Sequence, residues 1–329
     1  MPRIGINPSR GKKSDYEPAR VTMAVLTYLP HQSGYFKNRF DVTRACLESI
    51  LVNTAMPFDL LVFDNGSHHT LVDYLCGLHR QGKIDFLILS DHNIGKIGAL
   101  QMISQSAPGE IIAYSDDDVF FLPGWLEKHL EIIDTYPSVG LVTGFYIKSH
   151  MDESTGSTMA FAERADVSVK RGDLIDPALT QHYLEQMGRT KEQYQKELEG
   201  LEDVKLTYKG VETYASAGHH QFVCFKKTLT NVLPKKWTNH LMGKMRELDA
   251  SINEQGLLRL STVQPVTRLL GNTIDTKSAE EIRKFGIEIS GVETIPSKEK
   301  PKALIKNPIV QKCAYYLYER LFRIINIDD

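Results

Sequence analysis

The chain has 329 residues, 42% of them hydrophobic and 24% charged, a composition that fits an ordinary folded protein and excludes a disordered or fibrous one. The 39 basic and 41 acidic residues give a formal net charge of -2, so there is no electrostatic reason to expect nucleic acid as a partner. No apolar run reaches the roughly 18 residues that a membrane-spanning helix needs.

The cysteine spacing and the N-terminal residues indicate the cellular compartment that we expect for the protein. Cys46, Cys76, Cys224 and Cys313 lie far apart and form neither a Cys-x-x-Cys motif nor a zinc-binding spacing. We therefore expect reduced thiols in a cytoplasmic protein. Residues 1–20 are polar and basic and lack the apolar stretch of a signal peptide, so we expect a flexible tail there.

Strand and helix patterns alternate through the first half of the chain. The predicted strands are Val21–Tyr28, Asp59–Asp64, Ile84–Ser90, Glu110–Tyr114 and Val139–Ile147. The predicted helices are Lys37–Asn53, Thr70–Arg80, Gly95–Ala107 and one that begins at Pro123 and continues through Ile133. This alternation predicts an α/β fold, with a mostly parallel central sheet and helices on both faces. In such a sheet the ligand crevice lies at the carboxyl ends of the strands.

The pattern is weaker after His150. Residues 150–215 mix polar, glycine and charged positions around a solvated helix near Lys191–Leu201, which indicates an insertion or a flexible region. The later predicted elements are a strand at Gln221–Lys226, a helix at Met242–Gly256, a strand at Leu257–Val266, a linker at Pro296–Pro308 and a final helix at Ile309–Ile325. We divide the chain into the tail 1–20, a main domain 21–275, and a linker with a C-terminal helix over 276–329.

Three consecutive carboxylates, Asp116, Asp117 and Asp118, directly follow the predicted strand Glu110–Tyr114. Adjacent carboxylates repel one another, and a bound cation removes that cost. Mg²⁺ and Mn²⁺ prefer carboxylate oxygens and keep positions open for phosphate oxygens. The structural alternative is an exposed acidic turn that caps the helix beginning near Pro123.

This strand, the acidic triplet and the Pro-Gly-Trp-Leu at 123–126 resemble the GT-A glycosyltransferases, particularly the inverting glycosyltransferase family 2. The resemblance covers about residues 21–271 and is strongest over 21–145. It implies a GT-A (Rossmann-like) fold with a nucleotide-sugar half, 21–145, an acceptor half, 146–275, and a C-terminal helical extension. It also implies that Asp116 binds the donor ribose and the metal region, with Asp117 beside it, and that Asp118 ligates Mn²⁺ or Mg²⁺.

Three further segments resemble the family in the right order. The first is Thr27-Tyr28, which closes the first strand. The second is the Asp-Asn-Gly-Ser turn at 64–67, whose Asp accepts a hydrogen bond from the base in the family. The third is the helix start Asn93–Leu100. The base is often uracil, so a UDP-sugar is favoured. At a helix start, small residues let the backbone approach a diphosphate, and a lysine adds charge. The donor-binding residues implied by these segments are Thr27, Tyr28, Asp64, Asn65, Asn93, Gly95 and Lys96.

The second half resembles the acceptor side of the family. The stretch that begins Glu247-Leu248-Asp249 and ends at Gly256 is similar to the family's acidic stretch that carries the general base, although Leu248 separates two acids that many members have adjacent. We expect Asp249 to be the base, with Glu247 as the next choice. The alternative is an ordinary acidic first turn of a helix.

One departure concerns the metal. Many relatives have His-x-Gly-Asn where this chain has Arg268-Leu-Leu-Gly-Asn272. Arg268 does not ligate a cation, but its planar fork can pair with phosphate, so we place it in the donor site. The third metal ligand stays open: His219 or His220 is one choice, and the other is that both histidines belong to the acceptor pocket or to the core.

The resemblance implies an inverting, metal-dependent transfer of a sugar from a nucleoside diphosphate to a carbohydrate or lipid-linked acceptor. Two alternatives remain: a metal-dependent nucleotidyltransferase, disfavoured because Leu29–Gln32 is no glycine-rich loop, and a catalytically impaired sugar-nucleotide-binding protein. The C-terminal helix has two interpretations. It packs on the main domain or on a second copy in a homodimer, or it lies on a membrane surface as a peripheral contact.

Overall fold

The structure is a computed structural model that describes residues 5–152, 154–186, 192, 194–195, 198–237, 240–241, 245–289, 317 and 320. The contacts divide the chain into two units, Met1–Val292 and Glu293–Asp329. The predicted linker and C-terminal helix therefore lie outside the described residues, apart from Leu317 and Arg320.

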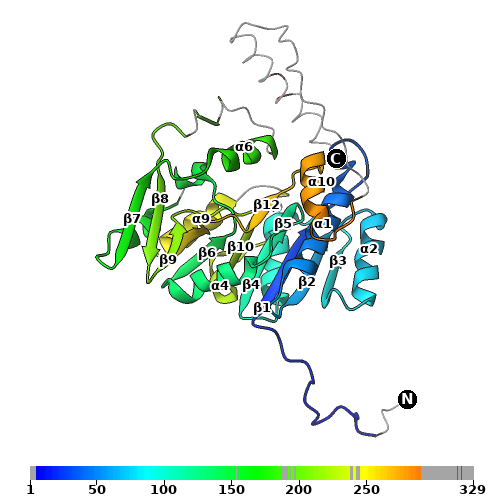
Figure 1. Cartoon of the computed structure of the whole chain (residues 1–329). Helices are drawn as coiled ribbons and strands as arrows, with labels where there is room; N and C mark the ends of the chain where they lie inside the picture. The colour runs from blue at the N-terminus through cyan, green and yellow to red at the C-terminus, as the bar shows by residue number, and fades with distance from the viewer. Residues whose placement is uncertain are drawn as a thin grey trace. The chain divides into compact units, whose positions relative to one another are not determined.

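Ten strands of the first unit form one sheet (Figure 1). The strands are β1 (Val21–Thr27), β2 (Asp59–Asn65), β3 (Phe86–Ser90), β4 (Ile111–Asp116), β6 (Val139–Thr143), β7 (Val167–Gly172), β8 (Asp203–Tyr208), β9 (Val211–Tyr214), β10 (Gln221–Phe225) and β11 (Leu258–Thr262). Their order is β3-β2-β1-β4-β10-β6-β11-β9-β8-β7. Strands β3, β2, β1 and β4 are parallel neighbours, as are β6 and β11, whereas β10 runs antiparallel between β4 and β6. A separate ribbon pairs β5 (Val119–Phe121) with β12 (Thr267–Leu269).

Helices cover both faces of the sheet, as predicted. They are α1 (Arg39–Asn53), α2 (His69–Arg80), α3 (Gly95–Ser106), α4 (Trp125–Thr135), α5 (Gly156–Ala162), α6 (Pro177–Gln186), α8 (Lys226–Val232), α9 (Met245–Glu254) and α10 (Thr276–Arg283), with single 3₁₀ turns η1 (Gly34–Phe36) and η2 (Lys148–Asp152). Alternate residues of β1 enter different core layers, because successive side chains of a strand point to opposite faces. Met23 and Val25 pack with α1, α2 and α4, whereas Ala24 and Leu26 pack with α3, α8 and α9. The predicted α/β fold class, with a mostly parallel stretch of central sheet and helices on both faces, is confirmed.

The region 150–215 differs from the prediction, because it is largely regular. Helix α5 is followed by β7, and β8 and β9 continue the sheet as an antiparallel meander beyond β11. In β7, Val167 and Val169 alternate with exposed Ser168 and Lys170. Such half-exposed strands give a weaker apolar signal than the fully buried parallel ones. Within the helix predicted near Lys191–Leu201, the described residues Glu192, Tyr194 and Gln195 are helical and residues 198–200 form a turn.

Residues beyond both predicted boundaries of the main domain contact it. Helix α10 contributes Ala279 and Ile282 to a cluster with Val42 of α1 and Phe120 of β5, so the first unit continues past residue 275 to Val292. At the other end, the predicted tail is attached to β2 from Tyr16 onward. The Tyr16 hydroxyl and the Ala19 amide both donate to the Asp59 carboxylate at 2.9 Å.

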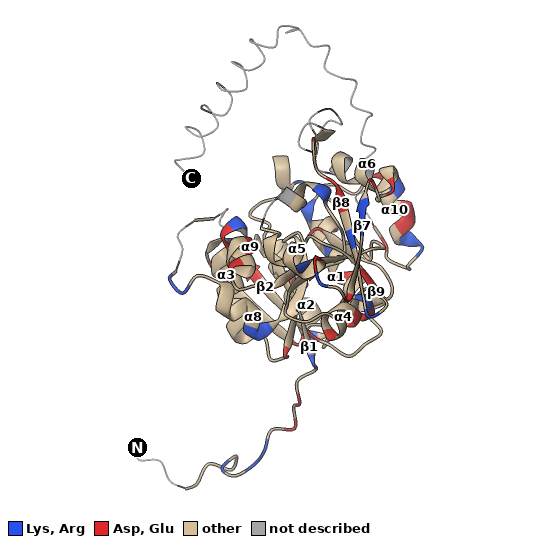
Figure 2. Cartoon of the chain, turned by 90° about the vertical axis from the view of Figure 1, so that its left-hand side faces the viewer, with Lys and Arg blue, Asp and Glu red and all other residues tan. Residues whose placement is uncertain are grey.

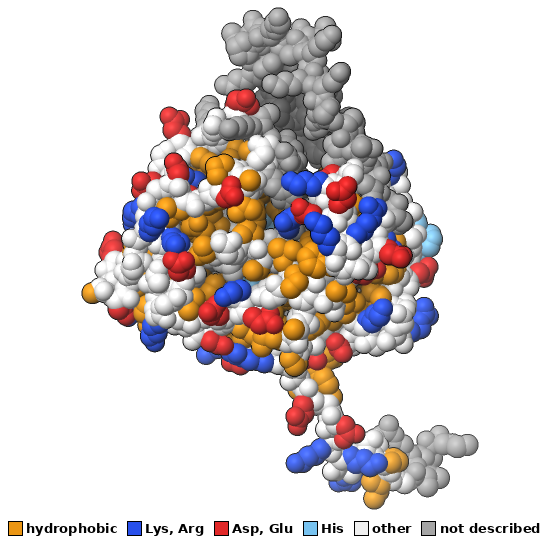
Figure 3. All heavy atoms as spheres, in the orientation of Figure 1, with side chains coloured by type: hydrophobic (Ala, Val, Ile, Leu, Met, Phe, Trp, Pro, Cys, Tyr) orange, Lys and Arg blue, Asp and Glu red, His pale blue; other side chains and the backbone are white. Residues whose placement is uncertain are grey.

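The described surface is mixed in character. On the face shown in Figure 3, hydrophobic side chains gather across the middle, and acidic and basic side chains are interspersed around them. No continuous basic stripe covers the described part of this face. Among the helices that the structure describes, none is both long and apolar enough to cross a bilayer. Three of the four cysteines, Cys46, Cys76 and Cys224, are described, and all three are free.

Candidate active site

The carboxyl ends of the first four strands meet at one edge of the sheet, as the alternating pattern predicted. In the strand register Thr27 lies opposite Asp64, and Asn65 lies opposite Ser90. On the other side of β1, Leu26 lies opposite Asp116. The segments that the sequence assigned to the donor therefore lie next to one another.

The Asp-Asn-Gly-Ser turn after β2 is tied to both of its neighbours. Asp64 is 1% exposed, and its two oxygens accept from the Thr27 hydroxyl at 2.9 Å and from the Ser67 amide at 3.0 Å. The Asn65 side chain donates to Asn93 Oδ1 at 2.9 Å. A carboxylate can accept about four hydrogen bonds, so Asp64 retains capacity for a base. In this structure it first holds the turn against β1.

The start of α3 requires glycine. Gly95 has a φ of +75°, and a Cβ there would lie 2.2 Å from the His240 carbonyl oxygen. Its amide donates to Asn93 Oδ1 at 2.9 Å. The backbone at this helix start is therefore closely approached by another part of the chain, whereas its predicted contact with a diphosphate stays a prediction. The surface that approaches is the segment at His240, while Lys96 extends from the next position toward the acidic triplet.

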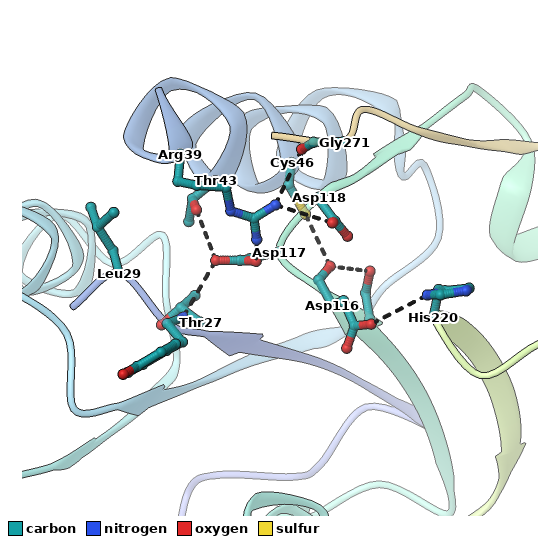
Figure 4. A network of polar contacts seen from close by, with 12 residues as sticks. Thr27, Leu29, Arg39, Thr43, Cys46, Asp116, Asp117, Asp118, His220 and Gly271 are labelled. Carbon is teal, nitrogen blue, oxygen red and sulfur yellow. Dashed lines mark hydrogen bonds and ion pairs between the residues drawn. The ribbon is translucent and has the colours of Figure 1, made fainter. Parts of the chain in front are cut away.

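Asp116 faces basic side chains from α3 and from the start of β10. Lys96 Nζ donates to Asp116 Oδ2 at 2.7 Å. His220 Nδ1 lies 3.7 Å from the same oxygen (Figure 4). The Tyr114 hydroxyl donates to Oδ1 at 2.6 Å. Burial raises the pKa of Asp116, but Lys96 and His220 outweigh it and hold this pKa below its usual value. The carboxylate is therefore ionised at neutral pH.

Asp117 turns toward α1 instead (Figure 4). It is 4% exposed, forms an ion pair with Arg39 and accepts from the Thr43 hydroxyl at 2.8 Å. Burial raises the pKa of Asp117 to about 6, against the opposing effect of Arg39. Asp117 thus anchors the acidic loop to α1, and its assignment to the donor stays a prediction.

Arg39 is a site residue that the sequence analysis missed. Its guanidinium pairs with Asp117 and with Asp118 Oδ2 at 3.0 Å, and it also donates to the Gly271 carbonyl at 3.1 Å. The side chain is 10% exposed. A cation at the first residue of a helix opposes the helix dipole. That unfavourable position is the one signal that could have identified Arg39.

Asp118 carries an unsatisfied oxygen. Its Oδ1 is buried and has no hydrogen-bond partner among the described residues, whereas its Oδ2 accepts from Arg39. A buried acceptor without a donor is costly, and a divalent cation would satisfy it. Within the described part of the chain, no three His, Cys, Asp or Glu side chains are grouped to hold a metal by themselves. Asp118 and Asp116 therefore fit a cation whose remaining ligands come from elsewhere, such as diphosphate oxygens.

The two adjacent histidines contact two different acids. His220 lies beside Asp116, whereas His219 Nδ1 lies 3.3 Å from Asp249 Oδ2. Asp249 is 1% exposed and pairs with the equally buried Arg259, whose Nη2 lies 3.2 Å from Oδ1. Since the His219 side chain is 22% exposed, it is the member of this pair that reaches the surface.

A third histidine, His150, packs against His219. The rings of His150 and His219 stack at 5.7 Å with an angle of 11° between their planes. Burial lowers the pKa of His150 to about 3, so this ring is neutral at physiological pH. A neutral ring against His219 leaves Asp249 as the acid that sets the electrostatics of His219.

The two remaining predicted residues lie apart from this group. Glu247 is exposed in the first turn of α9, two residues before buried Asp249. Arg268 on β12 forms an ion pair with Glu281 of α10, in a pocket that Phe120 and Phe285 also line. The Arg268 side chain therefore contacts α10 rather than the acidic triplet in this structure, and its assignment to the donor phosphate stays a prediction.

Residues 35–198 match the family model described as Glycosyl transferase family 2. This segment of the chain is a glycosyltransferase family 2-like domain. A curated relative, the uncharacterized glycosyltransferase YwdF of Bacillus subtilis (strain 168), is 27% identical over 116 residues. That alignment covers 35% of this chain and 39% of YwdF.

Two solved structures have partial similarity to this chain. Residues 1–349 of TarS from S. aureus, in complex with UDP-GlcNAc, are 18% identical with a TM-score of 0.31, over 38% of this chain and 34% of that one. The mannosyltransferase PcManGT from Pyrobaculum calidifontis, in complex with GDP-Man and Mn²⁺, is 21% identical with a TM-score of 0.32, over 42% and 40% of the two chains.

Proposed function

We propose that this protein transfers a sugar from a nucleoside diphosphate, with UDP favoured, to an acceptor hydroxyl with inversion at the anomeric carbon. The observation that carries the proposal is that two adjacent histidines, His219 and His220, lie beside two different acids, Asp249 and Asp116. Asp116 with Lys96 and His220 forms a site of mixed charge, and Asp249 with His219 forms a candidate base beside it.

The leaving group is stabilised by charge. As the bond between the anomeric carbon and the phosphate oxygen breaks, its electron pair moves to the diphosphate, and positioned cations stabilise that charge. Lys96 from α3 and Arg39 from α1 are the two cations of this chain nearest the acidic triplet among the described contacts. A Mn²⁺ or Mg²⁺ ion held by Asp118 and Asp116 would add positive charge against the diphosphate.

The proton of the acceptor hydroxyl goes to the His219–Asp249 pair. We keep Asp249 as the base residue of the proposal, but its 1% exposure means that it acts through His219, which is oriented by the contact at 3.3 Å. The acceptor oxygen then forms its bond to the anomeric carbon from the face opposite the diphosphate. These two roles follow the general pattern in which a buried carboxylate orients a histidine base.

The test measures donor binding and turnover separately. We expect UDP-GlcNAc to raise the unfolding temperature in Mn²⁺ more than GDP-mannose does, and to be slowly hydrolysed without acceptor. Asp118→Asn should remove both effects, while Glu247→Gln, an exposed neighbour of the base, serves as the matched control and keeps both. Binding without any release of UDP by the unaltered protein would instead favour a catalytically impaired sugar-nucleotide-binding protein.

A further inference from the structure

A row of side chains crosses five strands at the end of the sheet opposite β3. The register places Thr143 of β6 opposite Ser261 of β11, then Tyr214 of β9, Lys205 of β8 and Lys170 of β7. The hydrogen bond of 3.0 Å between the Thr143 and Ser261 hydroxyls shows that these positions share one face. With strands about 4.8 Å apart, the row extends for about 19 Å.

A cavity of about 400 Å³ lies on the outer part of this row. That volume is within the range of small-molecule sites. Tyr146 and Tyr214 form one wall, stacked at 4.4 Å with 25° between their planes, and Phe145 and Tyr183 also line the cavity. Aromatic faces combined with hydroxyl groups suit an amphipathic ring such as a sugar.

The other wall is basic. Lys148, Lys170 and Lys205 line the cavity, against one lining carboxylate, Asp176. Lys170 and Lys205 are direct cross-strand partners, and like charges in that arrangement destabilise a sheet. Figure 2 shows blue basic positions on the neighbouring strands β7 and β8. Glu212 offsets part of the repulsion by pairing with Lys205 at 2.7 Å. A bound anion would offset the rest.

Lys148 supports the same interpretation. Its side chain is 11% exposed, yet its partner at 2.7 Å is Asp173, which is 95% exposed. The buried carboxylate Asp203 lies farther away, at 3.8 Å, and is already engaged by the Leu174 amide at 2.8 Å. A mostly buried ammonium whose close counter-ion is in solvent is available to a ligand anion.

The cavity adjoins the candidate active site through a single segment. Phe145 and Ile147 line both this cavity and a small pocket beside His220. Three residues farther along, His150 stacks on His219. The segment 145–150 therefore connects the basic cavity with both histidines.

We propose that this cavity is an acceptor subsite that binds a saccharide bearing an acidic group, a phosphate or a carboxylate. The sugar ring lies against the Tyr146–Tyr214 wall, and the acidic group lies between Lys148, Lys170 and Lys205. The role as acceptor rests on the proposed function, whereas the binding of an acidic saccharide is measurable without any transfer.

Calorimetry on the full chain tests the binding. The probes are glucose 6-phosphate, glucuronic acid, neutral methyl glucoside and inorganic phosphate. We expect at least one acidic sugar to bind more tightly than methyl glucoside, and the double variant Lys170→Gln/Lys205→Gln to weaken it by 10-fold or more. Lys128→Gln is the matched control, because Lys128 is 61% exposed on α4 and does not line the cavity.

The outcomes distinguish a phosphate ligand from a carboxylate ligand, and they test the subsite separately from the proposed function. A preference for glucose 6-phosphate identifies a phosphorylated saccharide, and a preference for glucuronic acid identifies a carboxylated one. Unchanged binding in the double variant overturns the proposal, and so does inorganic phosphate binding as tightly as the sugar phosphate. UDP binding in Mn²⁺ should be the same in the double variant and the unaltered protein, so a failure of donor binding would count against the proposed function alone.

Discussion

Replacing Asp249 with asparagine should affect stability and catalysis through two different neighbours. The substitution keeps the shape of the side chain but removes the negative charge that faces the guanidinium of Arg259, itself 1% exposed. Removing one partner of a buried ion pair costs about 3–5 kcal/mol. The Ala217 carbonyl, which accepts from Arg259 at 2.5 Å, remains and places the expected loss of unfolding free energy near the lower end, at about 3 kcal/mol.

The catalytic effect should appear in a second measurement. Loss of the base should reduce turnover by about 10²–10⁴-fold, with donor affinity near that of the unaltered protein. Urea unfolding gives the stability and single-turnover release of UDP gives the rate. His219→Gln is the matched variant, because it removes the exposed partner of Asp249 and leaves the Asp249–Arg259 pair intact. It should lose a similar factor in rate with little loss of stability.

Three results would refute this reasoning. If Asp249→Asn is as stable as the unaltered protein, the buried pair does not hold this part of the fold. If His219→Gln is fully active while Asp249→Asn is inactive, the acceptor proton does not pass through His219. If both are active and Glu247→Gln is not, the base lies on the exposed first turn of α9.

Three further predictions concern other parts of the molecule. Asp118→Asn should abolish transfer and the Mn²⁺-dependent stabilisation by UDP; near-normal activity in the presence of a chelator would show that the metal assignment is wrong. Asp64→Ala removes the acceptor of the Thr27 and Ser67 hydrogen bonds and should weaken nucleotide binding by about 1–3 kcal/mol, which calorimetry measures; unchanged affinity would place the base elsewhere. Burial lowers the pKa of His129 from 6.5 to about 4, so the unfolded chain takes up this proton first and stability is lost as the pH falls from 6.5 toward 4. Urea unfolding measures the free energy of unfolding at pH 7 and at pH 4.5. The decrease between the two pH values should be about 2 kcal/mol smaller in His129→Gln than in the unaltered protein. An equal decrease in both proteins would contradict a buried neutral histidine.

The parallel half of the fold was predictable because its signals are local. Buried strands such as β1 and β2 are continuous apolar runs, and each ends in a polar turn whose position follows from the run itself. The meeting of Thr27, Asp64 and Asp116 at one edge then follows from the rule for parallel sheets. The antiparallel meander of β7, β8 and β9 was missed, because half-exposed strands resemble polar loops in sequence.

The directions of the acidic side chains were not predictable from the sequence. Three identical residues in a row carry no local information about which one faces inward. Arg39 decides it, from a helix 78 residues away along the chain. In the same way the ion pair of Arg268 was not predictable, because its partner, Glu281, lies on α10, in a stretch that the sequence analysis assigned to the linker and C-terminal helix, 276–329. Long-range ion pairs of this kind determine the directions of the side chains at the site, whereas local sequence patterns determine the helices and strands.

The position of β10 has a consequence for how the protein can be altered. The Asp116 amide donates to the His220 carbonyl at 2.8 Å, and Gln221 lies opposite Ser115, so the alignment of one strand pair assigns each histidine to its acid. A slip by one residue would exchange the faces of His219 and His220 and displace the leaving-group partner and the base together. Acceptor preference is therefore better redesigned at Lys170 and Lys205, four and three strands beyond β6, where a change leaves this alignment intact.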